Sequence, residues 1–83
     1  MTPERILYIE ATEAEITQFA EERGFLREAV ADHYGPKADM YLDWLMEDLT
    51  PEAISRAARI AIYCDGMIED FATWYLSKKE EVA

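Results

Sequence analysis

Hydrophobic residues recur at helical spacing through the last part of the chain. Ile54, Ala61, Ile68 and Tyr75 stand seven residues apart, and this phase holds on both sides of the dipeptide at 65–66. An α-helix brings every seventh residue back to nearly the same face. The pattern therefore predicts one long helix over residues 51–79.

Both ends of this predicted helix carry the residue types that helix ends prefer. Thr50 is a favourable N-cap, and Pro51 already has a helical φ at the first helical position. Glu52 lies in the first turn, and Lys78 and Lys79 lie in the last turn, where the helix dipole favours their charges. The end signals therefore agree with the hydrophobic period.

The apolar arc of the predicted helix is too wide for one neighbouring helix to cover. Such a helix is central to a bundle or also contributes to an intermolecular contact. One flank carries large side chains at spacings of three, four and seven residues. We interpret this flank as a self-association surface, made of Ile60, Tyr63, Met67 and Trp74.

Asp65 and Gly66 interrupt the apolar pattern of the predicted helix. A glycine inside a helix costs about 1 kcal/mol relative to alanine. We interpret Gly66 either as a point where another helix approaches closely or as a kink. Asp65 is either a solvated flank or a group that pairs with Arg or Lys of a neighbouring helix or partner.

The first part of the chain contains two helix-start signals. Thr2-Pro3-Glu4 is one, and Thr12 with Glu15 has the spacing of a capping box. Gly24 ends the second segment, which predicts a helix over residues 13–23. Residues 3–10 are either a bent extension of this helix or a separate turn, because no second strand is available to pair with them.

Two shorter helices are predicted between Gly24 and Thr50. The first covers residues 25–34 and stops at Gly35-Pro36. The second covers residues 40–49, with Asp39 as its cap. Short connections are typical of antiparallel bundles. We therefore predict an all-α protein, a single domain over residues 1–83, with three to four helices organised on one long C-terminal helix.

The net charge of −10 excludes several classes of partner. An acidic chain repels nucleic acid phosphates and anionic membranes, so neither is expected as a direct ligand. Residues 1–50 hold twelve acidic and four basic residues, a net −8, so the acidity belongs mostly to the elements around the predicted long helix. No signal peptide or membrane span is expected. One cysteine is compatible with a reducing cytoplasm.

The sequence offers no convincing catalytic or metal-ligating set. His33 is the only histidine and lacks the Glu-x-x-His spacing of di-iron bundles, so we expect a partly buried residue at a helix end. Cys64 lies in an apolar column in the middle of the predicted long helix, so we expect a buried, inert thiol. We therefore expect no enzyme activity and no cofactor or metal.

An acidic stripe lies on the predicted helix 40–49. Asp39, Asp43 and Glu47 stand four residues apart, which places them in one column of a helix, and Asp48 is adjacent. Met40, Tyr41 and Trp44 border the column. A solvated face is the simple interpretation. The alternative is a protein-binding surface, because aromatic and methionine side chains are enriched in such surfaces.

Two hypotheses about function follow from these patterns. The first is a small acidic, non-catalytic protein-binding module, an inhibitor that occupies the basic, nucleic-acid-binding surface of a host protein and so mimics the charge of nucleic acid. Many small inhibitors of this kind come from phages and mobile elements. The second is a homodimeric adaptor module whose acidity serves only solubility.

Overall fold

The computed structural model describes residues 1–82, which fold as an all-α protein. Helices follow one another through short connections, as the sequence predicts. In chain order they are α1 (Pro3–Glu10), α2 (Glu13–Arg23), α3 (Leu26–Tyr34), the 3-10 turn η1 (Ala38–Tyr41), α4 (Leu42–Asp48), α5 (Pro51–Cys64) and α6 (Ile68–Val82).

Three threonines cap helices, as predicted. The side-chain oxygens of Thr2, Thr12 and Thr50 each accept the N–H three residues ahead, at 3.1–3.2 Å. Glu15 completes the capping box by accepting the N–H of Thr12 at 2.9 Å. Residues 3–10 form a helix of their own, because the chain is extended at Ala11 before α2 begins.

The predicted single helix over residues 51–79 is wrong. The chain ends α5 at Cys64, reverses, and begins α6 at Ile68. Gly66 has a φ of 69°, and its N–H donates to the carbonyl of Tyr63 at 3.4 Å. The N–H of Met67 donates to the carbonyl of Ile62 at 2.9 Å. These two bonds form a Schellman motif, so Gly66 terminates a helix and does not continue one.

The prediction for residues 40–49 is correct only in part. Residues 38–41 form a 3-10 turn, and the α-helix begins at Leu42. Asp39 therefore lies inside the turn and does not cap α4, while Tyr41 occupies the cap position without a side-chain cap bond. Helix α3 begins at Leu26, one residue after the predicted start.

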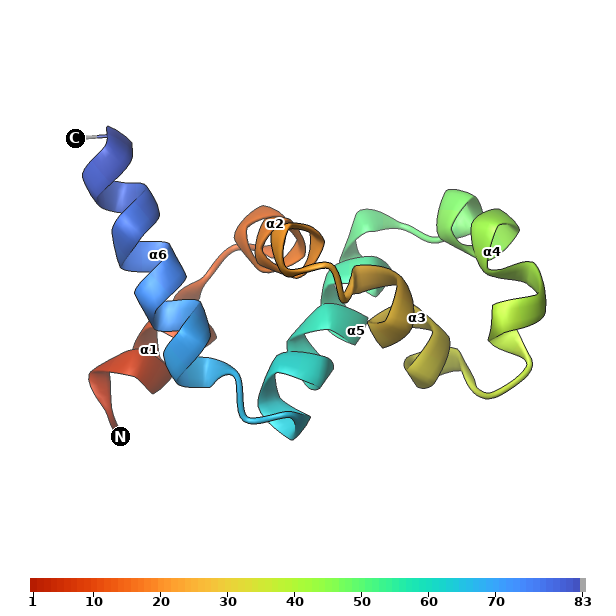
Figure 1. The fold of residues 1–83 in the computed structure, drawn as a ribbon, viewed down its shortest axis with the longest axis horizontal. Coiled ribbons are helices and arrows are strands. Elements are labelled where there is room, and N and C mark those ends of the chain that lie inside the picture. The colour runs from red at the N-terminus through yellow and green to blue at the C-terminus, as the bar shows by residue number, and fades with distance from the viewer. Residues whose placement is uncertain (83) are drawn as a thin grey trace.

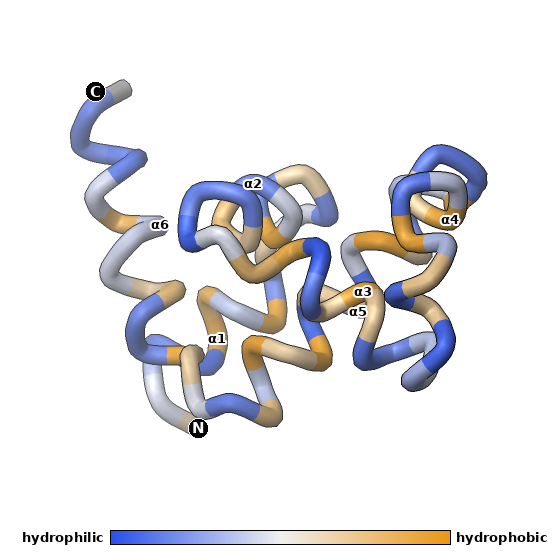
Figure 2. Tube along the Cα trace, turned by 45° about the vertical axis from the view of Figure 1, so that its right-hand side comes forward, coloured by the Kyte–Doolittle hydropathy of each residue, from blue (hydrophilic) through white to orange (hydrophobic). Residues whose placement is uncertain are grey.

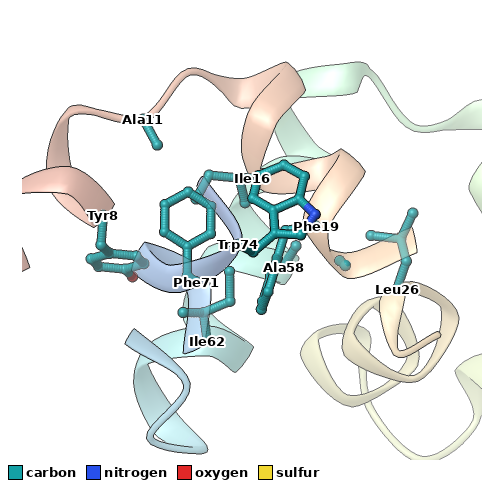
Figure 3. Packing of buried hydrophobic residues seen from close by; sticks show 10 residues of the cluster. Tyr8, Ala11, Ile16, Phe19, Leu26, Ala58, Ile62, Phe71 and Trp74 are labelled. Atoms are coloured by element: carbon teal, nitrogen blue, oxygen red, sulfur yellow. The ribbon is translucent and has the colours of Figure 1, made fainter. Parts of the chain in front are cut away.

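The main core lies where α1, α2, α5 and α6 meet. Its centre is a set of aromatic rings (Figure 3): the ring of Phe19 lies edge-on to those of Phe71 and Trp74, with centroids 5.3 and 5.5 Å apart. Phe19 and Phe71 are fully buried, together with Ile16 and Ile62. The reversal at residues 65–67 is what brings the rings of α6 against α2.

A second, smaller cluster joins α3, η1 and α4 to α5. Its buried members are short or aliphatic, in contrast to the aromatic main core. Met46 and Ile54 contact both clusters and so connect them. The molecule is elongated, with extents of 40 × 26 × 18 Å, and α1 and α6 lie at the end opposite α4 (Figure 1).

Helix α1 is joined to α5 by a pair of reciprocal contacts. The guanidinium of Arg59 donates to the carbonyls of Tyr8 and Ala11 at 2.7 and 2.8 Å. The hydroxyl of Tyr8 donates back to the carbonyl of Arg59 at 2.8 Å. Burial raises the pKa of the Tyr8 phenol, although the Arg59 charge opposes that shift, so the hydroxyl keeps the proton that it donates.

Helix α6 is attached to α2 through polar groups as well as through rings. The indole N–H of Trp74 donates to Glu22 Oε1 at 3.1 Å, and Lys78 Nζ lies 3.3 Å from Glu22 Oε2. The far end of α6 is hydrophilic and projects from the rest of the molecule (Figure 2). Leu76, in the second half of α6, is half exposed.

We expect Gly66→Ala to destabilise the protein by about 1 kcal/mol, because alanine is strained at a left-handed φ. A Cβ at this position would meet no atom within 4 Å, so the loss is conformational and not steric. Urea unfolding measures the change. Gly66→Asn, which tolerates this φ better, should lose less. A gain in stability for Gly66→Ala would contradict the observed turn.

We expect Glu22→Gln to change how the unfolding free energy depends on pH in the acidic range. The hydrogen bond from Trp74, followed by that from Gln18, lowers the pKa of Glu22 in the folded protein. A lowered folded-state pKa stabilises the fold above the unfolded value of about 4.3, and this contribution is lost as pH falls through the folded value. The difference in unfolding free energy between wild type and Glu22→Gln should therefore shrink on acidification.

A control for this measurement is Glu21→Gln, which removes an adjacent exposed carboxylate. Its stability difference from wild type should change less between neutral and acidic pH. The Trp74 indole N–H signal provides a second reading by NMR, because protonation of Glu22 weakens the bond that it donates. An indole signal insensitive to acid in wild type would contradict the assignment.

Candidate protein-binding surface

Helix α4 and η1 form one end of the molecule (Figure 1) and pack against the rest through few side chains. Ala38, Leu42 and Leu45 are buried against α3 and α5. Burial of positions 42 and 45 fixes the face of α4 that points inward, since residues three apart share a helix face. The residues between them must therefore point outward.

Three large apolar side chains remain exposed at this end. Met40 is 84% exposed, Trp44 63% and Tyr41 43%. The rings of Tyr41 and Trp44 meet edge to face, with centroids 6.3 Å apart. These three residues line a shallow groove of about 380 Å³ together with Arg27, Asp39 and Asp43. We call this area the Trp44 surface.

The predicted acidic residues lie on η1 and α4, which carry the Trp44 surface, but do not form one helical column. Asp39, Asp43, Glu47 and Asp48 are all exposed. Because Asp39 belongs to η1, only Asp43 and Glu47 have the i, i+4 relation on a single α-helix. The prediction of one stripe on one helix is therefore wrong, although both Asp39 and Asp43 line the same groove.

Sequence reasoning missed Arg27 as a member of this surface. Its Nη2 lies 2.6 Å from Asp43 Oδ1, and its Nη1 is 4.0 Å from the sulfur of Met46. Asp43 is therefore partly neutralised within the chain. Both side chains are more than half exposed, so the pair adds at most about 1 kcal/mol to stability. No local pattern in the sequence reveals which acid of α4 lies next to α3.

The four residues predicted for self-association do not share a surface. Trp74 is only 8% exposed, and Met67 packs against the main core. The turn at Gly66 ends α5, so Met67 and Trp74 do not continue the helix that carries Ile60 and Tyr63. Ile60 and Tyr63 remain exposed on α5 at 42% and 56%, and Tyr63 also contacts the guanidinium of Arg5.

Cys64 and His33 are both exposed, contrary to the expectation from the sequence. Cys64 is exposed at the end of α5, because the helix stops there and does not carry the thiol into a core. His33 lies at the end of α3, as expected, but is exposed and not partly buried. Both line a groove of about 290 Å³ between α3 and α5, with Asp32 and Asp65 beside them. Asp65 is exposed at the end of α5.

Residues 1–82 contain no group of three His, Cys, Asp or Glu side chains arranged to hold a metal ion. None of the helices described here combines the length and apolar character needed to cross a membrane.

Comparison of the chain with protein-family models, with curated proteins and with solved structures gave no match.

Proposed function

We propose that this protein is a non-catalytic binding module whose Trp44 surface contacts a basic protein. The supporting observation is the exposure of Met40, Tyr41 and Trp44 around one groove, with acidic side chains at its edges. Aromatic and methionine side chains with charged neighbours are enriched in protein interfaces, and tryptophan contributes strongly to binding energy. An exposed tryptophan provides the apolar contact that charges alone do not supply.

The distribution of charge favours a basic partner. The chain has eighteen acidic residues and eight basic ones. Five of the basic side chains are already engaged within the chain, with carboxylates or main-chain carbonyls: Arg23, Arg27, Arg59, Lys78 and Lys79. The unbalanced acids create a negative field, which attracts a basic surface and raises its association rate.

A basic surface of this kind is the usual binding site for nucleic acid phosphates. A protein that covers such a surface excludes the nucleic acid from it. We therefore propose that the module acts as an inhibitor of a nucleic-acid-binding host protein, in the manner of small acidic phage proteins. Competition with nucleic acid distinguishes this proposal from binding that leaves the nucleic-acid site of the partner open.

The test is capture of proteins from a host lysate by the immobilised module, with identification of what is retained. We expect basic nucleic-acid-binding proteins, released by added duplex DNA or RNA and by raised salt. Asp39→Lys/Glu47→Lys should abolish capture. Asp43 is left unchanged in this variant so that its ion pair with Arg27 stays intact. Captured proteins that nucleic acid fails to release would contradict the inhibitor proposal.

The matched control for charge is Glu10→Lys/Glu80→Lys, which makes the same change in net charge at exposed positions near the ends of α1 and α6. It should retain capture. Trp44→Ala should weaken binding of the purified partner by roughly thirtyfold, corresponding to a contribution of about 2 kcal/mol. Tyr63→Ala, another exposed aromatic, should have little effect. Equal losses in the control variants would contradict the assignment of the surface.

A second candidate function is a homodimeric adaptor module, supported by the exposure of Ile60 and Tyr63 on α5. For this function we expect sedimentation equilibrium to show a dimer that Ile60→Asp/Tyr63→Asp dissociates, because burial of these side chains would favour association. A monomer at high protein concentration would contradict it.

A further inference from the structure

A further groove lies along α2 and shares no lining residue with the Trp44 surface. It has a volume of about 480 Å³ and lies between α2 and the connection from α4 to α5. The α2 side contributes residues along most of that helix, and the α4–α5 side contributes Leu49, Pro51 and Ile54. In Figure 1 this connection leads from α4 into the upper end of α5, and α5 packs on α2. We call this hollow the α2 groove.

The lining of the α2 groove combines apolar residues with two glutamates. Ala14, Thr17 and the polar Gln18 stand between Glu13 and Glu21 along α2, and Leu49, Pro51 and Ile54 form the opposite side. Glu13 and Glu21 are eight residues apart, which is a separation of about 12 Å along a helix. Both glutamates are exposed. The groove therefore offers two negative charges about two helical turns apart together with apolar side chains.

Charge is also unbalanced around the groove. Asp48 and Glu52 stand next to its lining residues Leu49 and Pro51, and both are exposed. Every charged residue that lines the groove is acidic. An apolar ligand without positive charge would leave these carboxylates desolvated and unpaired, which is costly. The occupant must therefore combine an apolar face with basic groups.

We propose that the α2 groove binds a basic amphipathic helix of another protein. Two turns of a helix laid along α2 place residues i and i+7 or i+8 beside Glu13 and Glu21. Lysine or arginine at those positions would pair with the glutamates. An apolar residue at i+3 or i+4 would enter the strip formed by Ala14, Leu49 and Ile54. This site is separate from the Trp44 surface and does not depend on it.

The probe is a fluorescein-labelled, end-capped peptide of about sixteen residues, long enough to form a helix. It carries two lysines eight residues apart, with leucine midway between them on the same face. A control peptide of the same composition places the lysines opposite the leucine. We expect the first peptide to bind in fluorescence anisotropy at low salt and the second to bind at least about tenfold more weakly.

Variants of the protein test the location of the site. Glu13→Gln/Glu21→Gln should weaken binding of the first peptide by about tenfold. The matched control is Glu10→Gln/Glu28→Gln, which removes two exposed acids outside the groove, one of them also in the first turn of a helix. It should change affinity by less than about twofold, as expected for screened distant charges. Equal effects of the two variants would overturn the proposal.

Amide chemical shifts separate this inference from the proposed function. Addition of the first peptide should perturb residues 13–21 and 49–54, and Trp44→Ala should leave its affinity unchanged. Perturbation confined to residues 39–47 would overturn the α2 groove as the site while leaving the Trp44 surface as a binding site. Absence of any binding by the first peptide would overturn the α2 groove and leave the capture experiment on the Trp44 surface unaffected.

Discussion

The fold depends on the chain reversal between α5 and α6. With its left-handed φ, Gly66 lets the N–H of Met67 reach back to α5 and end that helix. Helix α6 then returns to place Phe71 and Trp74 against Phe19. If the helix continued straight, these rings would lie beyond the end of α5, and neither α1 nor α2 would have an aromatic core to cover.

Local signals in the sequence predict the starts of α1, α2 and α5 but not this reversal. Thr2, Thr12 and Thr50 act through neighbouring residues, so the sequence contains all that their caps require. Gly24 and Gly66 terminate α2 and α5 with the same pair of hydrogen bonds. The sequence predicts a helix end at Gly24 but not at Gly66, because the seven-residue hydrophobic period continues across Gly66. Helices α5 and α6 face the same core, so the hydrophobic period continues from α5 into α6 although the chain reverses between them.

Some features of the candidate binding surfaces could be predicted from the sequence, and others could not. The exposure of Met40, Tyr41 and Trp44 could be anticipated, because a short helix rich in large side chains cannot bury all of them. The ion pair of Arg27 with Asp43 and the α2 groove could not, since each joins helices that are distant in the sequence. Contacts of this kind depend on how helices pack. The hydrophobic pattern of one helix does not identify the residues that it contacts on another.

The contact between α1 and α6 has a consequence for the order in which the protein folds. Tyr8 meets Phe71 with ring centroids 6.4 Å apart, across more than sixty residues of chain. Helical proteins usually fold quickly because most of their contacts are local, whereas this core must close a long loop first. During synthesis α1 therefore leaves the ribosome well before its packing partner exists. Until α6 follows, the apolar side of α1 is open to solvent and to chaperones.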